Sequence, residues 1–193
     1  LDEDLDLAPK TVLNAWVALS SFWTWAAKEL GYKHIMRDVE KPKARPKPML
    51  PYSEEEVRRL LDAVARMRAY SPASDQHVDG RRPTAYRDIA IIMVLLDCGL
   101  RASELCALAM KDYDRKQGRL SVHHGKGDKP RVVFIGQSAQ RALWRYLVSR
   151  GELHPGDPLF ARSDNGGRMD RNGLRMMIER AGDRAGVPGA CAH

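Results

Sequence analysis

Hydrophobic residues recur at the three-to-four-residue spacing of amphipathic helices in several parts of this chain. The first such stretch is followed by Gly31, and glycine commonly ends a helix because it adopts a left-handed backbone without strain. A second stretch opens with Ser53 and Glu56, which have the spacing of a capping box. The predicted amphipathic helices cover residues 11–30, 53–67, 136–150 and about 172–185.

The segment "YRDIAIIMVLLDC", residues 86–98, is apolar on nearly every side. Such a pattern is typical of a helix that lies buried at the centre of a domain. Gly99 ends this helix, and helical spacing resumes in a short helix from Arg101 to Leu108. The polar residues 69–84, which come before the apolar helix, are predicted to form a loop.

Short, turn-bounded segments replace the helical spacing after Lys111. The segments "RLSVHH" and "RVVFIG" flank "GKGDKP", whose glycine and aspartate content is typical of a hairpin tip. Residues 156–168 predict an irregular or hairpin stretch. We therefore expect an α+β fold that is mainly α-helical and contains a small antiparallel β-sheet.

The segment "RDVEKPKARPKPMLPYS" predicts an extended basic linker, because its prolines exclude a helix. Lys41, Lys43, Arg45 and Lys47 alternate with other residues along it. Two interpretations are open: a surface connector without a partner, or a strap that lies along phosphates. Before the linker, three tryptophans on one helix exceed what a lone helix can bury, so we expect that helix to pack against helices outside this chain.

The composition predicts a soluble intracellular protein. Hydrophobic residues make up 44% of the 193 residues, and no apolar run is long enough to cross a bilayer. The three cysteines cannot all pair with one another, which favours a reducing compartment. The net charge of +7 makes a polyanionic partner plausible, but charge alone leaves nucleic acid and an ordinary solvated surface about equally open.

Arg101 is the strongest candidate for a residue that binds a substrate. A guanidinium at the first turn of a helix suits bidentate phosphate binding, but an ion pair with Glu104 on the same helix face explains the residue equally well. Lys126 lies between two glycines at the predicted hairpin tip, where it either reaches a substrate or is one more solvated lysine. His123 and His124 are adjacent in a strand and point to opposite faces, so we expect no metal site.

Taken together, these segments resemble the tyrosine recombinases, the phage integrase family. The stretch "CGLRASELCAL" is similar to the first motif of that family, and "HHGKGDKPRVVFI" is similar to its hairpin between the second and third strands. The helix with its basic linker resembles the end of the core-binding domain, and "LPYSEEEVRRLLDA" resembles the start of the catalytic domain. The resemblance implies a partial core-binding domain at 1–36, a linker at 37–51 and a catalytic domain at 52–193.

The resemblance also implies roles for single residues. Arg101 would clamp non-bridging oxygens of the scissile phosphate, Lys126 would protonate the leaving 5′ oxygen, and His193 would bond the phosphate or help to deprotonate the nucleophile. Glu104 would support Arg101, because a carboxylate beside a phosphate is repelled. No cofactor is implied, since a covalent phosphotyrosine conserves the bond energy. The residues expected to contact double-stranded DNA are Lys41, Lys43, Arg45, Lys47, Lys129 and Arg131.

One departure from the family pattern limits this expectation. The second arginine and the nucleophilic tyrosine of the family follow the position of His193, the last residue of this chain. We therefore expect a truncated, catalytically incomplete chain that binds DNA without cleaving it, taken from a cytoplasmic, nucleoid-associated recombinase that acts as a homo-tetramer. Three alternatives stay open: a type IB topoisomerase, a non-catalytic DNA-binding or regulatory module, and a helical protein whose basic surface has no nucleic-acid partner.

Overall fold

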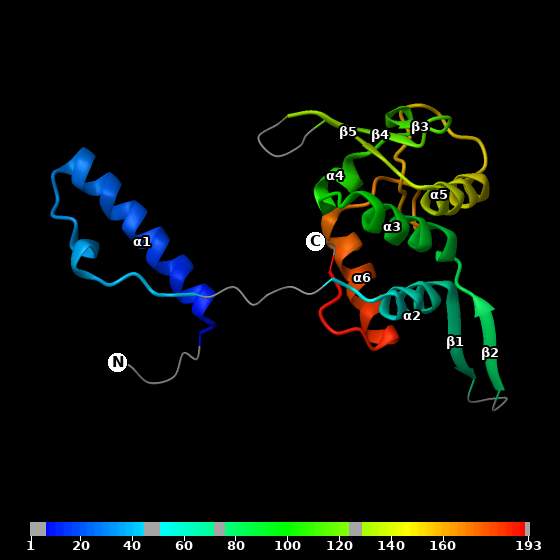
Figure 1. Cartoon of the computed structure of the whole chain (residues 1–193), viewed down its shortest axis with the longest axis horizontal. Coiled ribbons are helices and arrows are strands. Elements are labelled where there is room, and N and C mark those ends of the chain that lie inside the picture. The colour runs from blue at the N-terminus through cyan, green and yellow to red at the C-terminus, as the bar shows by residue number, and fades with distance from the viewer. Residues whose placement is uncertain (1–6, 45–50, 72–75, 124–128, 192–193) are drawn as a thin grey trace. The chain divides into compact units, whose positions relative to one another are not determined.

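The computed structural model describes residues 7–44, 51–71, 76–123 and 129–191. The chain forms two compact units, Leu1–Pro51 and Tyr52–His193 (Figure 1). The predicted capping box is confirmed at the start of the second unit, where the Ser53 backbone N–H donates to the Glu56 carboxylate at 2.7 Å and the Glu56 N–H donates to Ser53 Oγ at 3.2 Å.

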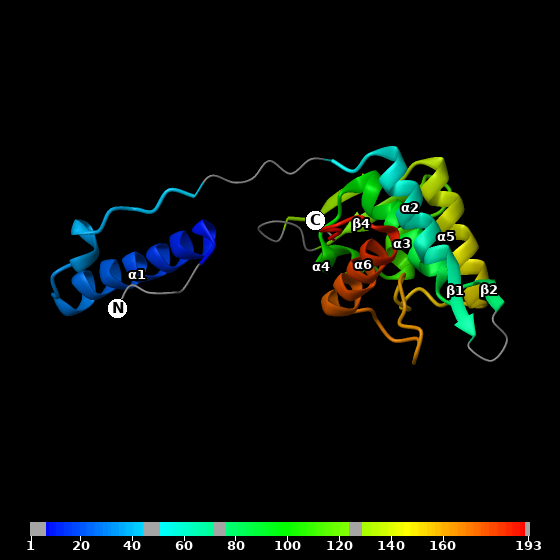
Figure 2. The same cartoon turned by 90° about the horizontal axis from the view of Figure 1, so that it is seen from below.

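The first unit is built on one long helix, α1 (Pro9–Leu30), followed by a 3-10 turn, η1 (Ile35–Asp38) (Figure 2). Gly31 ends α1 in the left-handed conformation (φ 70°), as the sequence predicts. The chain then runs back along the helix. The indole N–H of Trp16 donates to the Val39 carbonyl at 3.2 Å and joins the helix to the returning segment.

Most apolar side chains of α1 remain exposed within this unit. Phe22 and Trp25 are each 52% exposed, whereas Ala26 and Met36 are buried between the helix and the returning chain. Although α1 has 22 residues, no helix within the described ranges is long and apolar enough to cross a membrane.

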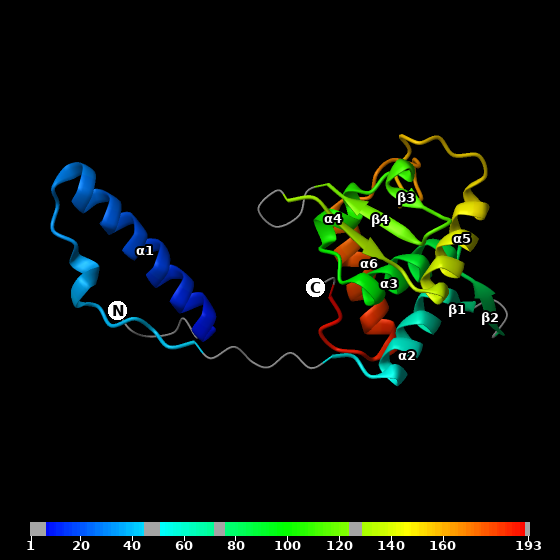
Figure 3. The ribbon, with the colours of Figure 1, turned by 45° about the horizontal axis from the view of Figure 1, so that its top comes forward.

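Helix α3 (Ala85–Cys98) occupies the centre of the second unit (Figure 3). It packs against α2 (Glu54–Ala65) and α5 (Gln137–Arg150), while α6 (Arg171–Ala185) packs against α2 and α4 (Ala102–Ala107). The prediction of a central buried helix is confirmed. The largest fully buried side chains of the core are Val64, Ile91, Val94, Leu105, Leu120, Leu143, Leu159, Phe160 and Leu174.

A three-stranded antiparallel sheet covers one side of this helical core. The 3-10 turn η2 (Met110–Asp112) leads into β3 (Tyr113–Asp114), which pairs with β4 (Arg119–Val122), and β4 pairs with β5 (Arg131–Phe134). The register places Val122 opposite Arg131. The strands predicted on either side of residues 125–130 are confirmed, and so is the mainly α-helical fold class with a small antiparallel sheet.

The prediction for residues 66–71 and 76–81 is wrong. Helix α2 ends at Ala65, and the segment expected to be a loop forms a second hairpin, β1 (Arg66–Ser71) paired with β2 (Gln76–Arg81). The physical reason is that a two-stranded ribbon can form through backbone hydrogen bonds alone. The second strand has Val78 as its one large apolar residue, so the alternation of apolar and polar residues that strand prediction depends on is missing there.

The segment between α5 and α6 has no regular structure of its own but is tied to the core at several points. The Met110 N–H donates to the Asp157 carbonyl at 2.9 Å, and the Leu159 N–H donates to the Leu108 carbonyl at 2.9 Å. A single bridge joins Ala161 to Arg168. The predicted irregular or hairpin stretch is therefore confirmed.

Candidate functional site

The candidate site begins with a buried carboxylate at the start of α4. Gly99 ends α3 in the left-handed conformation (φ 54°), which turns the chain so that α4 begins three residues later. Glu104 lies in the first turn of α4, its side chain is 1% exposed, and its Oε2 accepts the Arg101 backbone N–H at 2.8 Å. A buried carboxylate needs charged partners, because an isolated buried charge is strongly unfavourable.

Two arginines supply these partners. Arg101 Nη1 donates to Glu104 Oε1 at 2.9 Å. Arg131, which comes from strand β5, donates through both Nη atoms to the two Glu104 oxygens, each at 2.7 Å. The second pair has the parallel two-bond geometry that makes arginine–carboxylate contacts strong and directional.

The electrostatics of this cluster favour the fully ionised state. Hydrogen bonds from the Arg131 side chain, and then from the Arg101 backbone and side chain, lower the pKa of Glu104 to about 2, although burial opposes this shift. The same carboxylate raises the pKa of Arg131. At neutral pH the three groups therefore carry one carboxylate against two guanidiniums, which leaves one net positive charge.

This charge faces a surface hollow of about 470 Å³. Its lining residues are Gly99, Arg101, Lys129, Pro130 and Arg131. The side chains of Arg101 and Arg131 are 51% and 36% exposed, so both guanidiniums reach solvent while bonded to a buried acid. The structure thus brings together three cationic residues that the sequence analysis named separately, and an open cationic hollow of this kind is suited to binding an anion.

The ion-pair interpretation of Arg101 is confirmed, and phosphate binding by the same side chain stays a prediction. The residue is ion-paired to Glu104, and its guanidinium also lines the hollow. Arg131 was predicted only as a DNA contact, and its bidentate bond to Glu104 went unpredicted, because 27 residues separate the two.

The remaining residues that the sequence analysis named fall into two groups. Lys126, His193, Arg45 and Lys47 lie outside the described residues. Lys43 and Lys41 belong to the first unit, where the Lys41 ammonium lies 5.9 Å from the centre of the Trp16 ring.

Arg168 is a supporting residue that sequence reasoning missed. Its Nη1 donates to the backbone carbonyls of Cys106 at 3.0 Å, of Ala107, and of Leu108 at 3.3 Å. These carbonyls end α4, so one guanidinium closes the C-terminal end of the helix whose first turn carries Glu104. No local signal predicts this contact across 62 residues.

His123 also has a definite partner. Its Nε2 lies 2.9 Å from Asp112 Oδ1, and the buried Asp112 also accepts the Ala109 backbone N–H at 2.9 Å. The contact ties the end of β4 to η2. Across the described ranges, no three His, Cys, Asp or Glu side chains gather as metal ligands.

The second unit thus combines a mainly α-helical fold with a cationic hollow beside strand β5. The sequence profile of the phage integrase family matches residues 52–193. The chain belongs to this family.

Curated relatives support this assignment. The chain is 32% identical over 194 residues to tyrosine recombinase XerC of Mycobacterium sp. (strain KMS), covering 96% of this chain and 60% of the relative. It is 37% identical over 100 residues to tyrosine recombinase XerC of Pseudomonas fluorescens, covering 52% of this chain and 33% of the relative. The chain thus spans between one third and three fifths of the length of these two relatives.

Solved structures share the fold. The XerH site-specific recombinase in a post-cleavage complex matches with a TM-score of 0.69 at 22% identity, covering 97% of this chain and 54% of that one. Lambda integrase bound to DNA matches with a TM-score of 0.69 at 14% identity, covering 95% and 59%. XerA recombinase matches with a TM-score of 0.57 at 24% identity, covering 96% and 72%. At these identities the likeness establishes the fold.

Proposed function

We propose that this chain is the DNA-binding part of a site-specific recombinase. Such an enzyme cuts and rejoins DNA strands through a 3′-phosphotyrosyl intermediate. The observation that carries the proposal is the cluster of Arg101, Glu104 and Arg131 at an open cationic hollow. Family membership supports it, and so do relatives that are named tyrosine recombinases. Two structural neighbours, XerH and lambda integrase, are described as bound to substrate or DNA.

In this proposal Arg101 binds the scissile phosphate. Its guanidinium has donors left over after the single bond to Glu104, and its side chain is half exposed. Negative charge that develops on the phosphate oxygens is stabilised by a donor that is already oriented, so no reorganisation is needed during the reaction. Glu104 is the positioning residue, because it holds the backbone and side chain of Arg101 together.

Arg131 and Lys129 have different parts in the same hollow. Both Nη atoms of Arg131 bond to Glu104, so its main contribution is to keep that carboxylate ionised and fixed. Lys129 is exposed and supplies a mobile positive charge at the rim, suited to a neighbouring backbone phosphate. The expected DNA contact is therefore assigned to Lys129, with Arg131 acting through Glu104.

The remaining roles rest on the resemblance. Lys126 would be the general acid for the leaving 5′ oxygen, and His193 would assist at the phosphate or the nucleophile. The linker residues Lys41 and Lys43, with Arg45 and Lys47, would lie along the DNA backbone. The division into a partial core-binding domain at 1–36, a linker at 37–51 and a catalytic domain at 52–193 belongs to the same proposal, as does a tetramer on paired DNA sites.

Three tyrosines of the chain have surroundings of their own. The described residues that line the hollow include no tyrosine. The Tyr146 hydroxyl accepts the Ala161 N–H at 3.0 Å, the Tyr52 hydroxyl accepts the Cys191 N–H at 3.2 Å, and burial raises the pKa of Tyr113. These contacts support the proposal that residues 1–193 bind DNA without cleaving it.

The first test measures binding of a duplex to this chain as a function of salt. We expect the logarithm of the binding constant to fall linearly with the logarithm of salt concentration, because phosphate contacts release counterions. Arg101→Ala is compared with Arg162→Ala, an exposed arginine paired with Asp164 away from the hollow. Equal affinities for the two variants would remove Arg101 from the DNA contact.

The second test uses the intact recombinase that carries these residues. Arg101→Ala is expected to abolish formation of a covalent complex on a nicked duplex while most DNA binding remains. Lys126→Ala is expected to be rescued by a substrate with a better 5′ leaving group, and failure of the rescue would argue against the general-acid role. Relaxation of supercoils without strand exchange would indicate a type IB topoisomerase, and binding without any covalent complex would indicate a regulatory module.

A further inference from the structure

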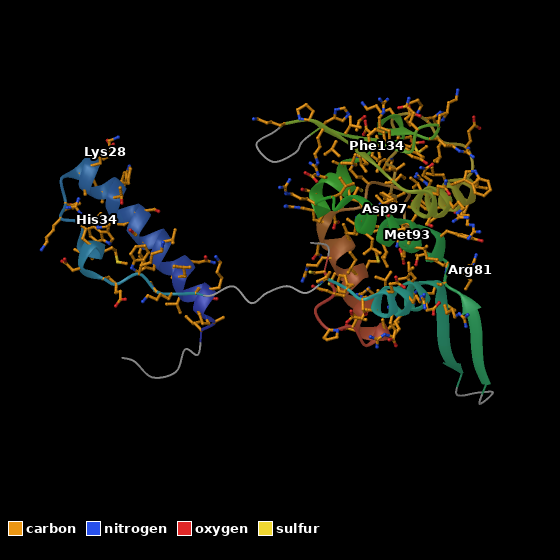
Figure 4. The ribbon with its side chains drawn as sticks, in the orientation of Figure 1. Lys28, His34, Arg81, Met93, Asp97 and Phe134 are labelled. Atoms are coloured by element: carbon orange, nitrogen blue, oxygen red, sulfur yellow. The ribbon has the colours of Figure 1, made fainter. Side chains whose placement is uncertain are left out.

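A second surface groove lies between α3 and α5, away from the cluster around Glu104. Its floor is apolar and is formed by half-buried side chains of Tyr86, Ile89 and Met93 on α3 and of Ala142 on α5. The α3 residues follow the spacing i, i+3, i+7, so they form one continuous seam along that helix. Figure 4 labels Met93 on this seam and Arg81 at its outer end.

Arginines border this apolar floor. Arg141 and Arg145 project from α5, and Arg81 reaches over from the end of β2, with its guanidinium carbon 4.6 Å from the centre of the Tyr86 ring. Among the residues that the structure describes, no carboxylate lies within ion-pairing distance of these three side chains. The groove therefore combines uncovered apolar surface with positive charge that the described residues leave uncompensated.

The dimensions of the groove limit what fits. The seam from Tyr86 to Met93 extends over about 10 Å at 1.5 Å per residue, which corresponds to about two turns of a facing helix. The α3–α5 groove has a volume of about 280 Å³, enough for a few apolar side chains. A groove between two helices accepts an amphipathic helix that lays its apolar face into the groove.

We propose that the α3–α5 groove is a docking site for an acidic, amphipathic helical segment of a partner protein. Two turns of such a helix would place apolar side chains on Ile89 and Met93, while its flanking Asp or Glu residues would pair with Arg141 and Arg145. The charge of the rim selects an acidic partner, and the apolar floor selects an amphipathic one.

DNA is the rival occupant, and the groove is poorly suited to it. A phosphate backbone would pair with the arginines but would leave Ile89 and Met93 uncovered. In addition, the groove and the hollow at Arg101 share no lining residue. The proposal does not depend on the recombinase activity.

The test uses synthetic fluorescein-labelled peptides of 14 residues and measures fluorescence anisotropy with the whole chain. The probe carries leucines on one helical face and glutamates beside them. A scrambled peptide of the same composition has its leucines distributed over all faces. We expect the probe to bind at least tenfold more tightly than the scrambled peptide. Equal binding of the two would overturn the proposal.

Charge reversal locates the binding site. The double variant Arg141→Glu, Arg145→Glu is expected to weaken probe binding at least tenfold. The matched control Arg58→Glu, Arg180→Glu changes the net charge equally at exposed positions outside the groove and is expected to change binding less than twofold. All four positions lie on helix surfaces, and circular dichroism verifies that each variant is folded. Loss of duplex binding with retention of peptide binding in the groove variant would assign the groove to DNA and overturn the proposal.

A methyl resonance tests the apolar floor without any substitution. The Met93 methyl group, labelled with carbon-13, is expected to shift on addition of the probe, whereas that of the buried Met169 is expected to stay in place. A probe that binds without moving the Met93 resonance lies elsewhere, and this result would overturn the proposal.

Discussion

One buried carboxylate, Asp88, lies in the first turn of α3, and another, Glu104, lies in the first turn of α4, and they hold their arginines in different ways. Asp88 is 4% exposed in its side chain and pairs with Arg87, which is itself only 13% exposed. Glu104 is 1% exposed and pairs with Arg101 and Arg131, which are 51% and 36% exposed. Asp88 thus pairs with a largely covered guanidinium, whereas Glu104 pairs with two guanidiniums that are more exposed.

The partners of the two acids explain this difference. Asp88 also accepts the Thr84 hydroxyl at 2.7 Å, and Arg87 donates to the Ala161 carbonyl at 3.2 Å, so this group joins α3 to the segment that follows α5. Glu104 instead joins α4 to β5 and leaves the outer sides of two guanidiniums in solvent. Both groups therefore stabilise the fold, but only the Glu104 group also leaves guanidinium N–H donors of Arg101 free toward the hollow.

The largest effect is expected from Glu104→Ala. Removing the carboxylate breaks four hydrogen bonds and opens a cavity, and we expect these losses together to cost about 3–5 kcal/mol of the free energy of unfolding. Urea denaturation measures the loss. Glu55→Ala, at an exposed position of α2, is the control and should stay within about 0.5 kcal/mol. A loss below about 1 kcal/mol for Glu104→Ala would show that the cluster does not stabilise the fold.

Acid titration measures how much the charge of Glu104 contributes to the stability of its cluster with Arg101 and Arg131. The pKa of Glu104 is lowered from 4.5 to about 2 in the folded chain, so its stabilisation is complete above the unfolded pKa and is lost as the pH falls toward 2. A shift of this size corresponds to about 3 kcal/mol. Comparing the free energy of unfolding of the wild type and Glu104→Gln from pH 5 to pH 2 should show a smaller acid loss in the variant. Parallel curves would contradict the assignment.

The variant Arg87→Gln tests the group formed by Asp88 and Arg87 in α3. Asp88 then loses the two bonds from Arg87 and, within the described part of the chain, keeps the side-chain hydrogen bond from Thr84. We therefore expect a loss of about 2–3 kcal/mol of the free energy of unfolding. Affinity for duplex DNA should not change at a temperature where the variant is fully folded. Reduced affinity in the folded variant would mean that Arg87 is not purely structural.

Arg101→Gln is expected to have the smallest effect on stability. Its ion pair is half exposed, and such pairs contribute about 1 kcal/mol or less. The affinity for duplex DNA should fall, and the slope of the salt dependence should decrease by about one unit, because one phosphate contact is removed. If Arg101→Gln destabilised the fold as much as Arg87→Gln, this result would contradict the assignment of Arg101 to DNA binding and of Arg87 to the stability of the fold.

Much of the second unit could be predicted from local patterns. The capping box of Ser53 and Glu56 and the glycine after α3 form between near neighbours, so a few residues of sequence contain the whole contact. The pairing of β1 with β2 escaped prediction because it lies in backbone bonds, and because β2 has a single large apolar residue, Val78, and so lacks the alternation typical of a strand.

The sequence by itself determined the helices, the strands on either side of residues 124–128 and the motif that carries Arg101 and Glu104, because these depend on spacings of a few residues. Only the tertiary structure decided that Arg131 bonds to Glu104 from 27 positions away and that Arg168, which follows α5 in the chain, closes the end of α4. Such contacts arise when the core packs and brings distant segments together. The partner of a buried charge is therefore set by packing and not by neighbours along the chain.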